Sequence, residues 1–324
     1  MNIAVIGLGS MGKRRVRLIR EMYPKFRVWG IDGREDRRNE AQARFDINVC
    51  ESIGEVKKNT MINCAFVCTS PLSHASIIKE CLLNGWNVFT ELNLIDTGYE
   101  ENIKLAAQQN VTLFLSSTFF YREEIKYIRS KITEKNNWNY IYHVGQYLPD
   151  WHPWENYKDF FVGDKRTNGC REILAIELPW IVGTFGEVKN TNVLADRITS
   201  LNINFDDNYL IEIKHWNGNK GILVADVVSP VAVRKLEVYS EGKYLFWNGT
   251  PDSLFEFDAN DKQLKQVSLL EKTEHVEGYS SFVVENAYKN EIREFFDVVE
   301  KKKTPSYGLV QDQKILKLID SIGA

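Results

Sequence analysis

The sequence lacks any apolar run of the length that a membrane span requires. The first predicted strand begins at residue 2, which leaves no room for a signal peptide before it. The formal net charge is only −3, so charge gives no reason to expect nucleic acid or an anionic membrane as a partner. These absences favour a cytoplasmic protein with neither a nucleic-acid nor a membrane partner.

Cysteine is scarce as well. The five cysteines are an odd number and include no Cys-x-x-Cys pair. Two of them, Cys64 and Cys68, fall on one face of the apolar segment 62–69. We therefore expect buried, reduced thiols and no metal site.

The composition is otherwise ordinary: 44% of the 324 residues are hydrophobic and 26% are charged, which suits a chain of two domains. Two basic clusters stand out, at residues 13–15 and 37–38. Acidic residues between positions 32 and 40 interleave with the second cluster. We interpret both clusters as solvated helix faces or as the surroundings of a cofactor.

The most informative segment is a glycine-rich turn at the start of the chain. A β-branched run at residues 2–6 leads into Gly7-Leu8-Gly9-Ser10-Met11-Gly12, and a helical segment follows. This order is typical of a dinucleotide-binding βαβ unit. Gly7 would make the tight turn, Gly9 would let the backbone approach a pyrophosphate, and Gly12 would let the helix pack against the strand. The amides of the first helical turn would hold the phosphates.

A second predicted strand, residues 26–31, ends in Asp32, where a carboxylate would accept the ribose hydroxyls. This acid favours NAD as the cofactor, because it would repel a 2′-phosphate. NADP stays open as the alternative, since the guanidinium of Arg34 would pair with that phosphate. A glycine-rich turn of some other α/β protein is the weaker interpretation, because strand, glycines, helix, second strand and acid occur in the required order.

Up to about residue 118, predicted strands and helices alternate, which indicates a parallel, doubly wound sheet. The expected helices span residues 36–45, 74–84 and 99–109, and the further strands span 47–50, 62–69, 87–90 and 111–115.

From residue 139 the pattern changes to strands joined by turns. The expected strands span residues 140–148, 191–198, 209–216, 221–228, 236–239 and 244–247, and the expected helices span 121–135, 172–184, 282–301 and 309–322. The predicted fold is therefore α/β, with a dinucleotide-binding domain at 1–120 and an α+β substrate domain with a mostly antiparallel sheet at 121–324. No linker separates them, so we expect a ligand cleft between them.

Three segments carry a resemblance to a known family. They are Val67-Cys-Thr-Ser-Pro-Leu-Ser-His74, Gly85-Trp-Asn-Val-Phe-Thr-Glu91 and Tyr307-Gly-Leu-Val-Gln-Asp-Gln-Lys-Ile-Leu316. Together they resemble the glucose–fructose oxidoreductase and inositol dehydrogenase family, Gfo/Idh/MocA. The resemblance implies an NAD(P)-binding Rossmann domain followed by a domain with an open-faced sheet, through which such proteins commonly form homo-oligomers.

The resemblance also implies which residues contact the cofactor. These are the residues of the glycine-rich turn, Asp32 and Arg34, together with Thr69, Ser70, Pro71, His74 and Glu91.

Two residues depart from the family's pattern. The family usually carries Glu-Lys-Pro, with the lysine near the reacting carbon, and a later helix with Asp-x-x-x-His as a proton relay. Here the first motif is Glu91-Leu92-Asn93, and on the later helix Glu172 matches the aspartate while Ile176 occupies the histidine position. Neither leucine nor isoleucine can take the hydroxyl proton that must leave during oxidation of an alcohol.

Three residues are candidates for the missing acid/base: Glu172, His152 and Lys158. A packed loop histidine is the alternative for His152. For Glu172 the alternatives are a structural pair with Arg171 and an N-terminal helix acid favoured by the dipole.

Aromatic residues gather around these candidates, which suits either the rim of a sugar site or the anchoring of a loop. The expected substrate-binding residues are Leu92, Asn93, Trp151, Trp154, Tyr157, Arg171 and Ile176. The sequence thus predicts an NAD(P)-dependent oxidoreductase for a sugar or nucleotide-sugar derivative. Two alternatives stay open: a catalytically silent dinucleotide-binding regulator or assembly protein, and a net-neutral epimerase or eliminase in which the cofactor is oxidised and reduced in turn.

Overall fold

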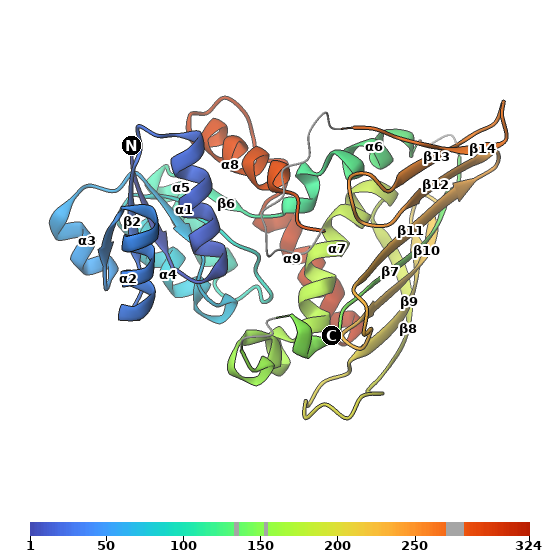
Figure 1. The fold of residues 1–324 in the computed structure, drawn as a ribbon, viewed down its shortest axis with the longest axis horizontal. Helices are drawn as coiled ribbons and strands as arrows, with labels where there is room; N and C mark the ends of the chain where they lie inside the picture. Colours follow the sequence, from blue (N-terminus) through green and yellow to red (C-terminus); the bar gives the residue numbers. More distant parts are fainter. Residues whose placement is uncertain (133–135, 152–154, 270–281) are drawn as a thin grey trace. The chain divides into compact units, whose positions relative to one another are not determined.

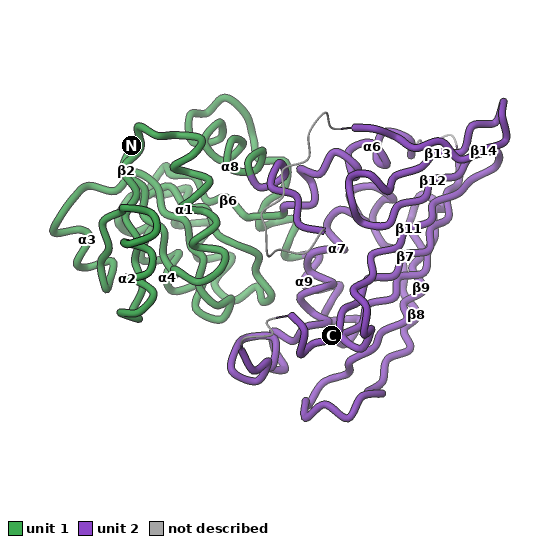
Figure 2. The backbone as a smooth tube through the Cα atoms, viewed as in Figure 1, with its two compact units in different colours: residues 1–117, 289–313 green, residues 118–288, 314–324 purple. Residues whose placement is uncertain are grey.

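The computed structural model describes residues 1–132, 136–151, 155–269 and 282–324. The chain divides into two compact units, coloured separately in Figure 2. Unit 1 comprises residues 1–117 and 289–313, and unit 2 comprises residues 118–288 and 314–324. Unit 1 thus includes residues 289–313, which the sequence groups with the C-terminal domain.

Unit 1 is built around a six-stranded parallel sheet in the order β3-β2-β1-β4-β5-β6. Its strands are β1 (Asn2–Ile6), β2 (Arg27–Ile31), β3 (Asn48–Cys50), β4 (Cys64–Val67), β5 (Asn87–Thr90) and β6 (Leu113–Leu115). Its helices are α1 (Ser10–Met22), α2 (Glu35–Phe45), α3 (Ile53–Asn59), α4 (Pro71–Leu83) and α5 (Tyr99–Gln109), with the greater part of α8 (Glu285–Val299) and the start of α9 (Leu309–Ile322). The predicted doubly wound sheet is confirmed, and α3 is an additional helix.

Helix α4 begins earlier than predicted. It starts at Pro71 and not at residue 74, because proline suits the first helical position, where its missing N–H costs no hydrogen bond. His74 therefore lies within the helix and not in the loop before it.

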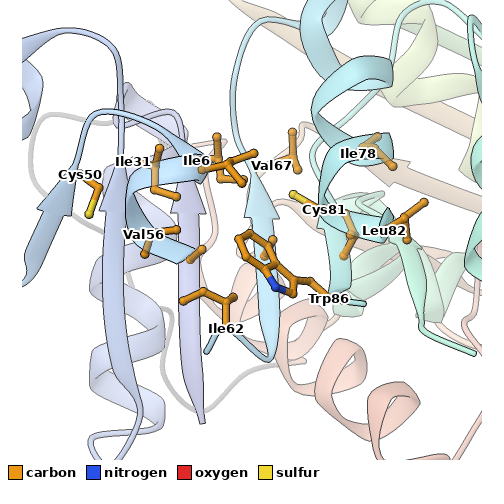
Figure 3. Close-up of a cluster of buried hydrophobic side chains, with 14 of the residues drawn as sticks. Ile6, Ile31, Cys50, Val56, Ile62, Val67, Ile78, Cys81, Leu82 and Trp86 are labelled. Atoms are coloured by element: carbon orange, nitrogen blue, oxygen red, sulfur yellow. The ribbon is translucent and has the colours of Figure 1, made fainter. Parts of the chain in front are cut away.

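Both faces of this sheet are covered, as parallel sheets require. Ala65 and Val67 of β4 belong to a buried cluster with side chains of α3 and α4, which Figure 3 shows in close-up. Between them Phe66 points to the other face, where its ring stacks on Phe89 with 4.7 Å between centroids and meets Phe295 of α8 edge-on at 5.2 Å. Alternation along the strand therefore divides the core into two layers.

Unit 2 contains an eight-stranded sheet in the order β14-β13-β12-β11-β7-β10-β9-β8. Its strands are β7 (Asn139–Gly145), β8 (Val188–Asp196), β9 (Asn208–His215), β10 (Lys220–Asp226), β11 (Val233–Ser240), β12 (Lys243–Trp247), β13 (Leu254–Asp258) and β14 (Gln263–Gln266). Among the pairs of this sheet in the described residues, only β7–β10 is parallel. This confirms the predicted, mostly antiparallel sheet, and β13 and β14 are additional strands.

The helices of unit 2 are α6 (Glu123–Lys131), α7 (Gly169–Phe185) and the end of α9. Short 3₁₀ turns lie at Thr118–Tyr121, Leu148–Asp150, Tyr157–Asp159, Phe161–Gly163 and Lys165–Thr167. Figure 1 shows α7 lying along one face of the sheet. No helix among the described residues has both the length and the apolar character to cross a membrane.

The two faces of this sheet differ. Tyr140 and Tyr142 of β7 are buried on the α7 side, where the ring of Tyr140 stacks on Phe185 with 4.3 Å between centroids. Ile141, which points the other way, is 45% exposed, and Ile222 stands opposite it on β10 in the same register. The outward face therefore presents apolar side chains to solvent.

Candidate functional site

The glycine-rich turn connects β1 to α1. Gly7 has a φ of +90°, and a Cβ there would lie 2.7 Å from the carbonyl oxygen of Cys68. A Cβ on Gly12 would collide with the carbonyl oxygen of Gly7. Any larger residue at either position would therefore force the first helical turn away from the sheet.

Gly9 leaves the opposite side of the turn open. It is the N-cap of α1 and has no side-chain hydrogen bond to the first turn, and the nearest atom to a Cβ placed on it is Nη1 of Arg37 at 3.7 Å. Ser10 is exposed and Met11 is half-buried beside it. Backbone amides at the start of a helix, with open space in front of them, fit the pyrophosphate of a dinucleotide.

Asp32 is bound to the glycine-rich turn itself. Its Oδ2 accepts a hydrogen bond from the Leu8 amide at 2.8 Å, and its Oδ1 accepts one from the Arg34 amide at 2.9 Å. The guanidinium of Arg34 is held by the exposed Asp36, with 2.6 Å between Nη2 and Oδ2. The side chain that forms an ion pair with Asp32 is instead Arg37, whose Nη1 lies 3.8 Å from Oδ2. Arg37, of the basic cluster at residues 37–38, therefore lies beside Asp32, although it is not among the predicted cofactor contacts.

His74 connects two loops at the carboxyl end of the sheet. Its ring is 2% exposed. Nε2 lies 2.9 Å from the carbonyl oxygen of Thr69, after β4, and Nδ1 lies 2.6 Å from Oδ1 of Asn93, after β5. Burial lowers the pKa of His74, so the neutral ring is favoured. Ser70 and Pro71 lie between Thr69 and His74, as the cap and first residue of α4.

Glu91 is held by a buried arginine. Arg15 of α1 donates to both carboxylate oxygens of Glu91, from Nε at 2.6 Å and from Nη2 at 3.1 Å. The same Nη2 donates to Oε2 of Glu291 at 2.8 Å, and the guanidinium lies 4.5 Å from the centroid of Phe89. Burial raises the pKa of Glu291. This Arg15–Glu91–Glu291 cluster fixes the loop after β5 to helices α1 and α8.

The cluster overturns one of the two interpretations given above for residues 13–15, the solvated helix face. Residues 13–15 are not a solvated helix face: Arg14 is 5% exposed and Arg15 is fully buried, while Lys13 alone pairs at the surface, with Glu40. The acids that make burial of Arg15 favourable lie 76 and 276 residues away in the sequence. Neither spacing nor composition could associate them.

Leu92 and Asn93 complete this loop. Asn93 is 2% exposed and Leu92 is half-buried. Because its side chain is a hydrocarbon, Leu92 offers no group that can exchange a proton.

In unit 2, α7 begins with a capped turn that contains Glu172. The side chain of Asn168 accepts a hydrogen bond from the Arg171 amide at 2.9 Å, which fixes the start of the helix. Glu172 is half-buried, and its carboxylate accepts no hydrogen bond from any residue that the structure describes. Burial raises the pKa of Glu172 to about 7. Ile176 follows one turn later on the same face.

Arg171 does not pair with Glu172. Its guanidinium donates to Oδ1 of Asp320 at 2.8 Å and to the carbonyl oxygen of Ala324 at 2.6 Å, and the residue is 7% exposed. The structural ion pair that the sequence left open for Glu172 is therefore not formed. Arg171 instead connects α7 to the end of α9.

The predicted aromatic rim is described in part. Trp151 is half-buried, donates from Nε1 to the carbonyl oxygen of Gln146 at 3.0 Å, and lies close to Gly169 at the start of α7. Tyr157 is half-buried, and Lys158 is exposed with Nζ 5.9 Å from the Tyr157 ring centroid. His152 and Trp154 lie outside the described residues.

Comparison with known proteins identifies the N-terminal region. Residues 1–116 match the family model GFO_IDH_MocA, described as an oxidoreductase family with an NAD-binding Rossmann fold. This region belongs to the Gfo/Idh/MocA family. The predicted nicotinamide dinucleotide cofactor is thereby confirmed for this region, which is an NAD(P)-binding Rossmann domain of the kind that this oxidoreductase family carries. No curated protein matches the chain.

Solved structures share the fold over almost the whole chain. An oxidoreductase from Agrobacterium radiobacter, solved with NAD+, L-tartaric acid and magnesium, is 11% identical, with a TM-score of 0.82 and coverage of 99% of this chain and 94% of that one. The WlbA dehydrogenase from Chromobacterium violaceum, with NADH and UDP-GlcNAcA, is 13% identical, with a TM-score of 0.77 and coverage of 100% and 92%. Biliverdin reductase from Synechocystis, with biliverdin and NADP+, is 13% identical, with a TM-score of 0.77 and coverage of 99% and 98%. At these identities the likeness shows a shared fold.

Proposed function

We propose that the protein oxidises or reduces a sugar or nucleotide-sugar derivative with NAD(P), and that Glu172 exchanges the proton of the reacting hydroxyl. The observation that carries this proposal is the environment of Glu172. A half-buried carboxyl group that has no hydrogen-bond partner among the described residues, and whose pKa is raised to about 7, matches what general acid–base catalysis requires near neutral pH.

The bound dinucleotide supplies the hydride exchange, and the chain must supply the proton transfer. Leu92 and Ile176 stand at the two positions where the family usually places proton-transfer groups, and both are hydrocarbons. Glu172 occupies the position of the relay aspartate, so it is the first candidate to take over the task. His152 is the second candidate, and Lys158, which is exposed, is the third.

The sugar-type substrate rests on the aromatic residues near the start of α7 and on structural relatives. Trp151 and Tyr157 offer flat apolar rings beside polar groups, which suits sugar recognition. Arg171 supports these aromatic residues indirectly, because its hydrogen bonds connect the start of α7 to the end of α9. The WlbA dehydrogenase was solved with a nucleotide sugar, whereas other proteins of this fold were solved with tartaric acid or biliverdin.

A catalytically silent dinucleotide-binding protein is the second candidate function, and Leu92 is the observation that favours it. To distinguish the two, purified protein loaded with NADH or NAD+ is mixed with a panel of sugars and nucleotide sugars while nicotinamide absorbance and fluorescence are recorded. We expect turnover with at least one sugar. Bound cofactor that responds to none of them would favour the regulator, and sugar conversion without net change of the cofactor would favour the epimerase or eliminase.

We also propose that the protein forms a homo-oligomer through the outward face of the unit 2 sheet. Ile141 and Ile222 are adjacent in register and 45% and 40% exposed, and Leu210 on β9 is 41% exposed. Exposed apolar side chains that are adjacent on one sheet face, as Ile141 and Ile222 are, suit burial against a second copy of the chain. Sedimentation of the parent and of Ile222→Lys tests this: we expect the variant to dissociate, and a monomeric parent would contradict the proposal.

A further inference from the structure

Unit 1 encloses a small cavity on the side of α5 that faces α4. It is lined by Ala75 and Ile78 of α4, Asn93 and Ile95 of the loop after β5, Asn102 of α5 and Leu309 of α9. We call it the α4–α5 cavity. Its volume is about 10 Å³. A space of roughly 10–15 Å³ holds one water molecule, provided that polar groups line it.

Two buried polar atoms at this cavity have no hydrogen bond of good geometry to any residue that the structure describes, although the Asn93 amide also lies near the hydroxyl of Tyr99. They are Nδ2 of Asn93 and Oδ1 of Asn102, on residues that are 2% and 3% exposed. The other amide atom of Asn102, Nδ2, donates to the carbonyl oxygen of Ala75 at 3.1 Å, which fixes the orientation of that side chain. Buried amide groups are almost always hydrogen-bonded to protein or to ordered water, so this pair requires an explanation.

The contacts of His74 also indicate that Asn93 needs a further hydrogen-bond partner. Both of its ring nitrogens face oxygen atoms, at Thr69 and at Asn93, whereas a neutral imidazole has a single N–H to donate. Reversing the amide of Asn93 resolves this conflict, because its NH2 then donates to Nδ1 and its oxygen turns away from the ring. In either orientation one polar atom of Asn93 faces the cavity, where its neighbour is the hydroxyl of Tyr99, whose hydrogen is already donated to Oδ2 of Asp312 at 2.5 Å. A water molecule satisfies both cases, because it can donate as well as accept.

We propose that one water molecule is bound in the α4–α5 cavity, hydrogen-bonded to Asn93 and Asn102, and that Asn102 through this water positions the loop formed by residues 91–93. The resulting chain of hydrogen bonds runs from Asn102 through the water, Asn93 and His74 to the carbonyl oxygen of Thr69. It connects α5 to the loops after β4 and β5, at the edge of the sheet where such folds bind ligands. Asn102 is thus a positioning residue, independent of which substrate the protein uses.

A high-resolution crystal structure of the full chain tests the binding site directly. We expect a single density peak within hydrogen-bond distance of both amides in the parent, and no peak in Asn102→Leu, whose side chain fills the cavity. An unoccupied cavity in the parent, or a peak that contacts only one of the two amides, would overturn the proposal. The parent structure alone decides this, even if the variant fails to fold.

The positioning role is tested by NADH affinity together with thermal stability. We expect Asn102→Leu to bind NADH roughly five-fold more weakly, the effect of one neutral hydrogen bond. Gln108→Leu, which adds the same side chain on the exposed side of α5, is the matched control and should leave NADH affinity unchanged. If Asn102→Leu lowers the melting temperature but leaves the NADH dissociation constant at the parent value, Asn102 is merely structural and the positioning role is wrong.

Discussion

The two units place carboxylates in contrasting environments, and the contrast separates structural acids from a candidate catalytic one. In unit 1, Glu91 and Glu291 share the guanidinium of Arg15. In unit 2, Glu172 has no hydrogen-bond or ion-pair partner in the part of the chain that the structure describes. Burial alone does not distinguish these groups, whereas the presence of a partner does.

A second acid on α7 sharpens the contrast. Glu177 is fully buried, and its carboxylate accepts hydrogen bonds from Arg234 at 2.6 Å, Tyr142 at 2.8 Å and Trp180 at 2.7 Å. It lies little more than one turn from Glu172 on the same helix. One helix thus carries an acid committed to packing and another that is available for proton exchange.

Replacing the unpartnered acid is expected to have the largest effect. Once a substrate is found, Glu172→Gln should lower turnover by about 10²–10⁴-fold, because the variant cannot exchange the hydroxyl proton. Turnover is measured by nicotinamide absorbance at saturating substrate. His152→Asn serves as the parallel variant. Full turnover and an unchanged pH–rate profile in both would rule out either residue as the acid/base.

Replacing Arg15, the cation that Glu91 and Glu291 share in unit 1, is expected to lower the free energy of unfolding. Arg15→Met should lower the free energy of unfolding by about 3–5 kcal/mol, because it leaves the buried Glu291 and the half-buried Glu91 without their counter-charge. Denaturant unfolding measures the change. Lys13→Met is the matched control: its pair with Glu40 is at the surface, so a change below about 1 kcal/mol is expected. Equal effects in both variants would mean that the buried cluster contributes no more than a surface pair.

The pH dependence of stability should follow Glu172. Its pKa is raised from 4.5 to about 7 on folding, so the folded protein holds the proton more tightly than the unfolded chain. The stability linked to this group is complete below the unfolded pKa and is lost as pH rises through about 7. Relative to Glu172→Gln, the parent should lose at most about 3 kcal/mol over this window. Parallel urea unfolding curves for the two proteins, with a pH-independent difference, would contradict a raised pKa.

The smallest expected effect concerns the choice of cofactor. Asp32 should favour NAD(H), because its carboxylate repels a 2′-phosphate, and Asp32→Ala should shift the ratio of the two dissociation constants toward NADP(H) by about ten-fold. Arg37→Ala is the companion variant and should shift the ratio the other way, since it removes the cation next to Asp32. Titration of both reduced cofactors, followed by fluorescence, measures the ratios. Tighter binding of NADP(H) by the parent would overturn the NAD assignment.

The spacing of residues within short stretches of the sequence was sufficient to predict the dinucleotide-binding fold. Glycine spacing, the helix after it and the acid at position 32 are properties of neighbouring residues, and the backbone follows them: Gly7 adopts a positive φ, Gly12 packs against the turn, and Asp32 binds the Leu8 amide. Short apolar runs similarly predicted the strands of the parallel sheet, and strand segments joined by turns predicted most strands of the other sheet. The position of Glu172 on a helix was also predicted, because helical periodicity is local.

What only the tertiary structure decided is which charged groups meet. Arg15 looks solvent-exposed in the sequence because its neighbours are basic, yet acids 76 and 276 residues away make its burial possible. Arg171 and Glu172 are adjacent in sequence, but Arg171 reaches α9 and does not pair with Glu172. Spacing along a chain determines backbone conformation within a few residues, whereas the pairing of buried charges depends on contacts that form only when distant segments fold together.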